Sequence, residues 1–231
     1  VYQTGSESST VQQRQIQQIR RELGLDRPVV VQYLDWIGGA VRGDFGQSYV
    51  QRRPVFDILM ERFPRSMELA ALTMLIAIVW AVPLGVVSAV RQNGPLDYLA
   101  RLVSLSGLSL PLFFTGALIL YGLVRFFRWL PPLEFVSFTE NPVENLKQLI
   151  WPALAQAYYI SAPITRLTRS QMLEVIRQDY VRTARAKGLA ERAVVYRHAL
   201  RNSLLPVVTF IGWWGGRLLG GLVIMEIIFV V

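Results

Sequence analysis

Four stretches of the chain are long and apolar, and charged residues flank the first three on both sides. Residues 66–90 contain a single charge, Glu68 near one end, and residues 102–124 contain none. Both stretches exceed the roughly 20 apolar residues that a helix needs to cross a bilayer. We therefore predict two transmembrane helices, the first kinked at Pro83 and the second carrying Pro111 at mid-depth.

The other two apolar stretches are less regular. Residues 148–165 are short and interrupted by two prolines, so they fit either a third span or a buried or re-entrant segment. Residues 204–229 form a fourth predicted span, which Arg217 interrupts and Glu226 ends. The pattern thus predicts an all-α fold, a polytopic transmembrane helix bundle with four spans in this chain.

Residues 1–65 precede these spans and alternate between apolar and polar positions. We predict a helix from Thr10 to Gly24, a second from Pro28 and a third from Pro54. Amphipathic helices of this kind pack on a membrane surface or on a bundle. The chain therefore divides into a helical segment at 1–65 and a transmembrane domain at 66–231.

Composition supports a membrane protein. Charged residues make up 17% of the 231 residues and hydrophobic residues 52%, whereas soluble domains carry about a quarter charged residues. The net charge of +8 could suit nucleic acid, but long apolar runs have no use in a nucleic-acid-binding domain, so we expect no nucleic acid. With no cysteine and one histidine, His198, we expect no metal site.

The basic residues indicate an orientation. Residues 166–203 hold nine Lys and Arg and residues 91–101 hold two, and both segments fall on one side of the predicted bundle. The short connection at 125–149, on the other side, holds three. Short loops rich in Lys and Arg stay in the cytoplasm, whereas long segments cross largely regardless of charge. We therefore place 166–203 in the cytoplasm and 1–65 on the outside.

The cytoplasmic segment contains "DYVRTARAKGLAERAVVYRHALRNSLLP", which begins at Asp179 and ends at Pro206. It reads as a helix, a left-handed glycine cap at Gly188, and a second helix. A basic hairpin of this kind fits contact with anionic membrane lipid or docking to a soluble partner, and the residues alone leave both open.

The same segment resembles the cytoplasmic signature loop of ATP-binding-cassette (ABC) importer permeases. That signature runs Glu-Ala-Ala, three residues, Gly, nine residues, Ile, one residue, Leu-Pro. Ala184, Gly188 and Leu200 fit it, and the Glu, first Ala, Ile and Pro positions, occupied by Arg182, Thr183, His198 and Arg201, depart from it. The departures resemble the oligopeptide/dipeptide/nickel branch, in which "DYVRTARAKGL" and "RHALRNSLLPVV" are usual forms. The phrases "RFPRSMELA" and "TRLTRSQMLEV" agree with that branch.

The resemblance implies a type I ABC importer permease. Permeases of this family usually have six membrane spans. The first of them would precede residue 1, and the last would follow residue 231. It implies as partners a homologous second permease, two ABC ATPase subunits and an extracytoplasmic substrate-binding protein. This sequence has no G-x-x-x-x-G-K-[ST] phosphate loop, so we expect no catalytic residue and no cofactor on it, with ATP and Mg bound by the ATPases.

In the family this loop forms a coupling helix that enters a groove of the ATPase. The resemblance therefore makes Gly188 an elbow of the coupling loop, with Ala184 and Leu200 as packing positions of the same hairpin. Exposed basic residues would suit an acidic groove. The candidate coupling residues are Tyr180, Ala184, Arg185, Gly188, Arg192 and Leu200.

Arg217 is a second candidate. It lies eleven residues beyond Pro206, or roughly 16 Å along a helix, near mid-membrane, where a charge usually faces a bundle interior or a wet cavity. Glu226 is nine residues further on, about 180° around the helix, and so is a poor partner for it. Beside Arg217 runs a stripe of small residues that lets another helix approach closely, formed by Gly212, Gly216 and Gly220.

Two interpretations of Arg217 stay open. It could face the translocation path, with Glu226, and meet an anionic group such as a peptide carboxylate. It could instead be structural, bonded to carbonyls freed at Pro83 or Pro111. For the cargo, the branch favours di- and oligopeptides, with nickel or another small solute as the alternative. An ion-coupled secondary transporter would need intramembrane acids, of which Glu68 and Glu226 are the few candidates.

Overall fold

The structure is a computed structural model that describes residues 24–132 and 134–230, together with residues 17 and 20. The chain forms two compact units, Val1–Phe63 and Pro64–Val231. Within the described residues the regular elements are helices, and a single isolated β-bridge joins Gln47 to Pro54. The helix predicted from Thr10 to Gly24 lies largely outside the described residues.

The described part of the first unit contains helix α2, Val29–Val41, which confirms the helix predicted from Pro28. Pro28 precedes α2 as its N-cap, and Gly43, with φ +84°, follows its end. None of its residues is buried within the chain. The apolar side chains of α2 are therefore open to solvent, lipid or another protein.

Helix α3, Val55–Val90, is 36 residues long and holds both Pro64 and Pro83 in its interior. The sequence suggested a short helix from Pro54 that leads into a separate span, but the two form one continuous helix. The boundary between the units falls inside it, after Phe63. Helix α3 is long and apolar enough to cross a membrane, as predicted for residues 66–90.

The second predicted span is built differently from the expectation. Helix α4, Pro95–Ser109, and helix α5, Leu112–Phe127, meet at an angle of 102°. Leu110 between them is extended, with φ −95° and ψ 131°. A residue that precedes proline avoids the α-helical region, so Pro111 ends α4 and becomes the N-cap of α5.

Helix α6, Pro142–Ile176, runs for 35 residues and continues through Pro152 and Pro163. The interruption predicted at these prolines is therefore wrong. The side chain of Asn141 caps its first turn by accepting hydrogen bonds from two backbone amides. By length and apolar composition alone, α3 is long enough to cross a membrane, and each of the bent pairs α4–α5 and Glu191–Gly221 with Val223–Phe229 can count as one further span.

The chain continues as α7, Asp179–Ala186, and α8, Glu191–Ala193. A π-helical turn η1, Val194–Ala199, then leads into α9, Leu200–Gly221. The last helix, α10, spans Val223–Phe229. The helical stretch Glu191–Gly221 and helix α10 meet at an angle of 52°, so the fourth predicted span is bent near Leu222.

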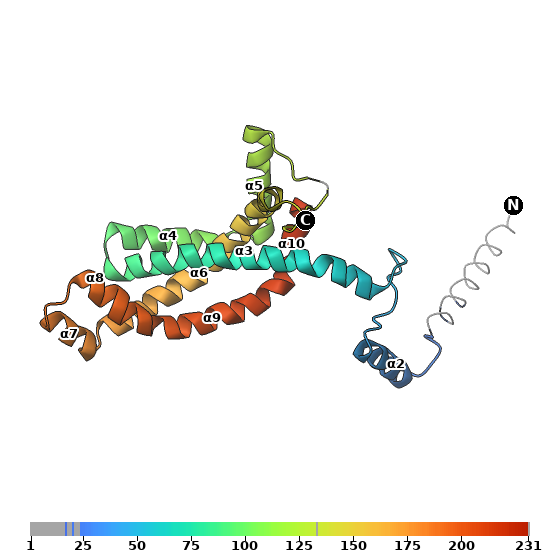
Figure 1. The fold of residues 1–231 in the computed structure, drawn as a ribbon, viewed down its shortest axis with the longest axis horizontal. Helices are drawn as coiled ribbons and strands as arrows, with labels where there is room; N and C mark the ends of the chain where they lie inside the picture. The colour runs from blue at the N-terminus through green and yellow to red at the C-terminus, as the bar shows by residue number, and fades with distance from the viewer. Residues whose placement is uncertain (1–16, 18–19, 21–23, 133, 231) are drawn as a thin grey trace, which may run out of the picture. The chain divides into compact units, whose positions relative to one another are not determined.

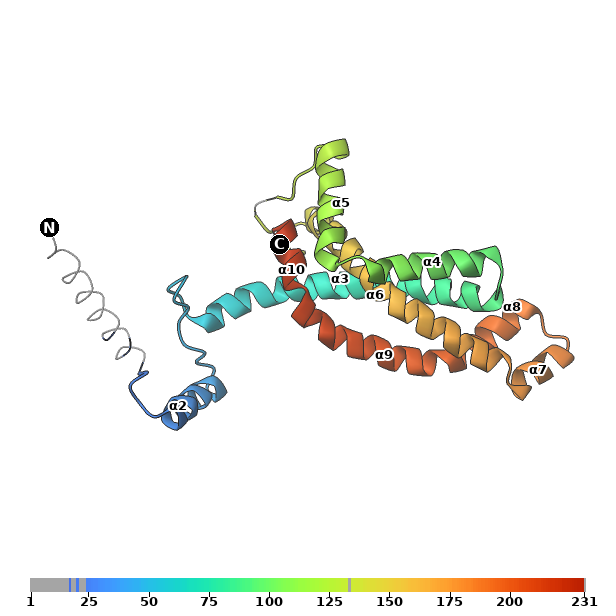
Figure 2. The same cartoon turned by 180° about the vertical axis from the view of Figure 1, so that it is seen from behind.

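Helices α3, α6 and α9 share the main hydrophobic core of the second unit. Small residues of α3 such as Ala77 and Ala81 pack against Ala153 and Ile160 of α6, and Val207 of α9 joins them. Figures 1 and 2 show α4 beside α3 and α6, with α7 and α8 at one end of this bundle and α5 and α10 toward the other. The fold confirms the predicted helical membrane bundle.

Candidate functional site

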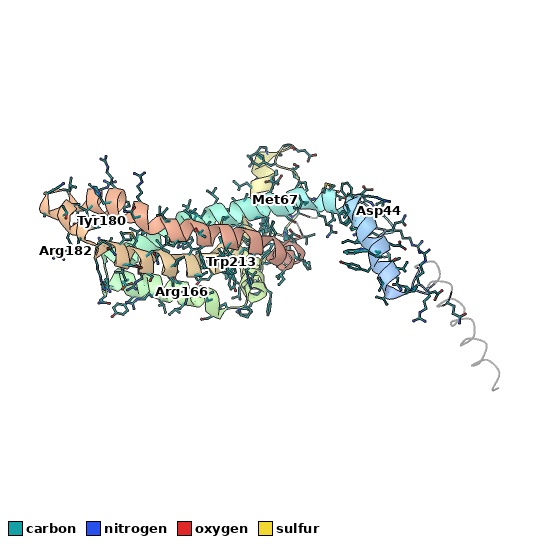
Figure 3. The ribbon with its side chains drawn as sticks, turned by 90° about the horizontal axis from the view of Figure 1, so that it is seen from below. Asp44, Met67, Arg166, Tyr180, Arg182 and Trp213 are labelled. Atoms are coloured by element: carbon teal, nitrogen blue, oxygen red, sulfur yellow. The ribbon has the colours of Figure 1, made fainter. Side chains whose placement is uncertain are left out.

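Five of the six coupling-loop candidates lie on α7, on α8 and on the turn between these helices, and the sixth, Leu200, begins α9. Val181 and Ala184 of α7 are buried against Val194 of η1, and Val175 from the end of α6 packs beside them. The opposite face of α7 is exposed, so this helix presents its polar side outward while its apolar side fixes it to the bundle. Figure 3 shows Tyr180 and Arg182 at this end of the molecule.

Gly188 has the left-handed backbone that the sequence predicted, with φ +76°. The amide of Gly188 donates to the carbonyl of Arg185, and the amide of Leu189 donates to the carbonyl of Ala184. These two bonds form a Schellman motif, which satisfies the last carbonyls of α7. A Cβ placed on Gly188 would meet no heavy atom within 4 Å, so the backbone conformation alone requires glycine.

Arg185 and Glu191 form an ion pair across this turn. The Nη2 and Nε atoms of Arg185 lie 2.7 and 3.1 Å from the two carboxylate oxygens of Glu191. These hydrogen bonds lower the pKa of the Glu191 carboxyl and raise the pKa of the Arg185 guanidinium. Arg185 is thus paired within the loop, where it joins the end of α7 to the start of α8.

The remaining coupling candidates occupy different surroundings. The hydroxyl of Tyr180 accepts a hydrogen bond of 2.8 Å from the side chain of Asn202, and the Tyr180 ring is largely exposed. Arg192 is exposed and lines a cavity of about 250 Å³ together with Arg91 and Tyr196. Tyr180 and Arg192 are therefore both accessible from the end of the bundle.

Ala184 and Leu200 both occupy packing positions, but in two different clusters. Ala184 belongs to the cluster around α7, whereas Leu200 packs against a separate cluster that includes Val86 of α3 and Met172 of α6. The reason is that the stretch predicted as the second helix of the hairpin leads through η1 into the long helix α9, where Leu200 lies. The sequence offered no signal for the π-helical turn.

Arg217 lies on the exposed side of α9 within this chain. Its guanidinium carbon lies 5.6 Å from the ring centroid of Trp213 and 5.8 Å from that of Trp214, both one turn earlier in the helix. Figure 3 marks the position of Trp213. Among the described residues these rings are its contacts, and no hydrogen bond joins Arg217 to a carbonyl near Pro83 or Pro111.

The glycine stripe on α9 is open. A Cβ placed on any of its three glycines, Gly212, Gly216 and Gly220, would meet no heavy atom within 4 Å. By contrast, a Cβ on Gly221 would lie 3.6 Å from the side chain of Gln156 on α6. The stripe therefore faces away from the helices of this chain that the structure describes.

Glu226 on α10 is half-buried, and its carboxylate accepts a hydrogen bond of 2.6 Å from the hydroxyl of Ser66 on α3. Glu68, also on α3, accepts a hydrogen bond of 2.7 Å from the side chain of Asn145 on α6. Both acids thus join α3 to another helix near the same end of the bundle.

Asp97 of α4 is a fully buried carboxylate that no sequence pattern marked as a site residue. It forms two hydrogen bonds with Arg169 of α6, at 2.8 and 2.9 Å, and a third with Arg101, at 2.8 Å. The amide of Asn93 and the hydroxyl of Ser88 also donate to it. The spacing of Asp97 and Arg101 indicates a helical pair, but nothing in the sequence links either residue to Arg169.

Comparison with known proteins identifies the family. Residues 81–230 match the family of binding-protein-dependent transport system inner membrane components, and residues 6–70 match the N-terminal region of such membrane components. The chain belongs to this family. More narrowly, it is an ABC importer permease of the peptide/nickel branch, a multi-pass protein of the inner membrane, and the permease is not itself catalytic.

Three relatives illustrate the match. An oligopeptide transport system permease protein of Bacillus subtilis is 39% identical over 95% of this chain and 70% of its own length. A putative peptide permease protein of Brucella suis is 42% identical over 94% of this chain and 69% of its own length. A glutathione transport system permease protein of Escherichia coli K12 is 37% identical, with coverages of 93% and 67%.

Proposed function

We propose that this chain forms, with a homologous second permease, the translocation pathway of an ATP-driven importer of peptides. The observation that carries the proposal is the exposed basic elbow of α7, Gly188 and α8 in a chain of this family. Two ABC ATPase subunits bind ATP and Mg, and one of them docks on the elbow. An extracytoplasmic binding protein delivers the cargo on the opposite side.

The nature of the elbow supports docking of a partner. Within α7 the apolar residues Val181 and Ala184 pack on Val194 of η1, so the outward face of this helix carries polar and basic groups. Arg182, Lys187 and Arg192 are exposed on the elbow, and an acidic groove on a soluble subunit would complement their charge. A basic surface that only touched lipid would not need the defined turn that Gly188 and its hydrogen bonds make between α7 and α8.

The names of the relatives support peptides as cargo. They are called oligopeptide, peptide and glutathione permeases, and glutathione is itself a small peptide. Nickel or another small solute is the alternative within the same branch. An ion-coupled mechanism is less supported, because the two acids that could serve it, Glu68 and Glu226, are engaged with neutral side chains between helices.

Reconstitution tests this function. The permease, co-expressed with its homologous second permease and the two ATPases, should purify as one complex that hydrolyses ATP. In proteoliposomes, the binding protein loaded with a dipeptide or an oligopeptide should stimulate hydrolysis and drive uptake of that peptide. Stimulation by a nickel chelate but not by peptides would reassign the cargo. Uptake driven by an ion gradient without ATP would overturn the proposal.

We further propose that the elbow lies in the cytoplasm and residues 1–65 outside, and cysteine labelling tests this orientation. The natural chain has no cysteine, so single substitutions report one site each. Asp35 and Glu191 have side chains that are 61% and 57% exposed, so a reagent can reach both positions. A membrane-impermeant maleimide should label Asp35→Cys in intact cells and Glu191→Cys only after permeabilisation. The reverse pattern would contradict the proposed orientation.

Arg217 and Glu226 are proposed to lie along the translocation path. The guanidinium of Arg217 is exposed on α9 and forms no ion pair with the described residues, so it is available to an anion. A terminal carboxylate of a peptide, or an acid on the second permease, would supply that anion. The open glycine stripe beside it gives the second permease a surface for close helix approach.

A further inference from the structure

Asp97 stands at the junction of three helices. Its carboxylate joins the end of α3 through Ser88, the start of α4 on which it lies, and α6 through Arg169. The carboxylate is fully buried, and the side chain of Arg169 is only 20% exposed. Two parallel hydrogen bonds between a guanidinium and a carboxylate fix both distance and orientation. The contact is therefore a rigid connection between α4 and α6.

Helix α6 leads directly from this connection to the elbow. Arg169 lies seven residues before Ile176, the last residue of α6, which is about 10 Å along the helix. Two residues, Arg177 and Gln178, then separate α6 from α7. Their amides donate to carbonyls of the last turn of α6, and the carbonyl of Gln178 accepts the first hydrogen bonds of α7. Val175 packs on Val181 of α7 as well. We therefore expect the end of α6 and the elbow to move together as one rigid unit.

The same end of α6 is also fixed to α3. A Cβ placed on Gly85 would lie 2.6 Å from the Cβ of Thr168 and 2.8 Å from the carbonyl oxygen of Thr165. The hydroxyl of Thr165 donates to the carbonyl of Ala81 on α3. Helices α3 and α6 are therefore in close contact beside Arg169, and they cannot separate there without losing these contacts.

We propose that Asp97 and Arg169 form a joint that transmits movement of the elbow to α3 and α4 and so couples ATP hydrolysis to cargo release. The proposal rests on the function proposed above. Both are positioning residues, since they touch neither cargo nor nucleotide. An apolar contact tolerates sliding, whereas a bidentate ion pair in a buried site holds one orientation, so this joint passes on the direction of a movement as well as its size.

The test uses the complete reconstituted complex of both permeases, the ATPases and the peptide-loaded binding protein. The measured quantity is ATP hydrolysis with the loaded binding protein divided by hydrolysis without it. Arg169→Gln and Asp97→Asn should assemble and keep their basal hydrolysis, while this ratio falls about fivefold or more, the range of ordinary coupling energies. The double variant should be no worse than the more affected single variant, because both remove the same joint.

Arg101→Gln is the matched control. Arg101 also bonds Asp97, at 2.8 Å, but it lies on the same helix and does not reach α6. Its removal takes a positive charge from Asp97 and leaves the joint between helices in place, so the ratio should stay near that of the unmodified protein. Arg169→Lys keeps the charge without the two-pronged geometry and should give an intermediate ratio.

The outcomes separate the possible failures. If the Arg169→Gln and Arg169→Lys complexes assemble and the loaded binding protein stimulates their ATP hydrolysis as much as that of the unmodified complex, the proposed joint is wrong. Loss of assembly in Arg169→Gln, Arg169→Lys and Asp97→Asn alike would also overturn it, because the residues would then be needed for folding and not for coupling. If the unmodified complex binds no ATPase or shows no stimulation, the proposed function itself fails.

Discussion

Gly188→Val is expected to abolish peptide uptake while the protein remains in the membrane. A side chain at φ +76° costs about 1–2 kcal/mol in the left-handed conformation, and a β-branched one is at the upper end of that range. To relieve this strain the turn must change, which alters the angle between α7 and α8. Uptake and ATPase retention, measured in the reconstituted complex, should both fall in this variant.

Gly188→Val acts through the backbone, and a control variant can show this. A Cβ at Gly188 would meet no neighbouring atom, so the substitution introduces no clash within the chain and its effect comes from the backbone. Gly188→Asn is the matched control, because asparagine visits the left-handed region more readily than other residues with a side chain. It should retain most of the uptake. Normal uptake by Gly188→Val would remove the elbow from the mechanism.

Arg217→Gln is expected to abolish or re-tune uptake while the complex assembles and basal ATP hydrolysis survives. The exposed guanidinium lies over two tryptophan rings, and it forms no ion pair with the described residues. Its removal should therefore leave this chain's packing nearly intact. A lost charged contact to cargo costs about 1.5–3 kcal/mol, which corresponds to a reduction in affinity of roughly tenfold or more.

Arg125→Gln provides the comparison for Arg217. The guanidinium of Arg125 likewise lies over an aromatic ring, that of Phe126, with the guanidinium carbon 5.9 Å from the ring centroid, and its side chain is exposed. It sits at the end of α5, away from the glycine stripe, and its loss should leave uptake unchanged. If Arg217→Gln instead fails to assemble, its role is structural, and if it transports peptides normally, neither interpretation holds.

The sequence predicted the helical membrane bundle and the glycine elbow because both depend on local patterns. Long apolar runs bounded by arginine define spans whatever their neighbours, and a glycine at the end of an amphipathic helix predicts a left-handed cap. The helix from Pro28 was found for the same reason. Features that depend on residues close together in the sequence were thus predicted correctly.

The errors arose where tertiary contacts decide. Proline predicts a break, yet α6 continues through Pro152 and Pro163 because packing on α3 and α9 holds it, while at Pro111 the chain does bend. The π-helical turn η1 within the predicted second helix of the hairpin has no sequence signature. The bond between Asp97 and Arg169 joins residues 72 positions apart, beyond the reach of periodicity.

The close contact at Gly85 limits how the two longest helices can move. Sliding α3 along α6 would drive the backbone at Gly85 into Thr168 and the carbonyl of Thr165, and packed interiors do not yield to such overlap. Rotation about this point leaves the contact in place. Alternation between the two faces of the membrane is thus expected to proceed as a pivot, with small displacements at Gly85 and larger ones at the far ends of α3 and α6.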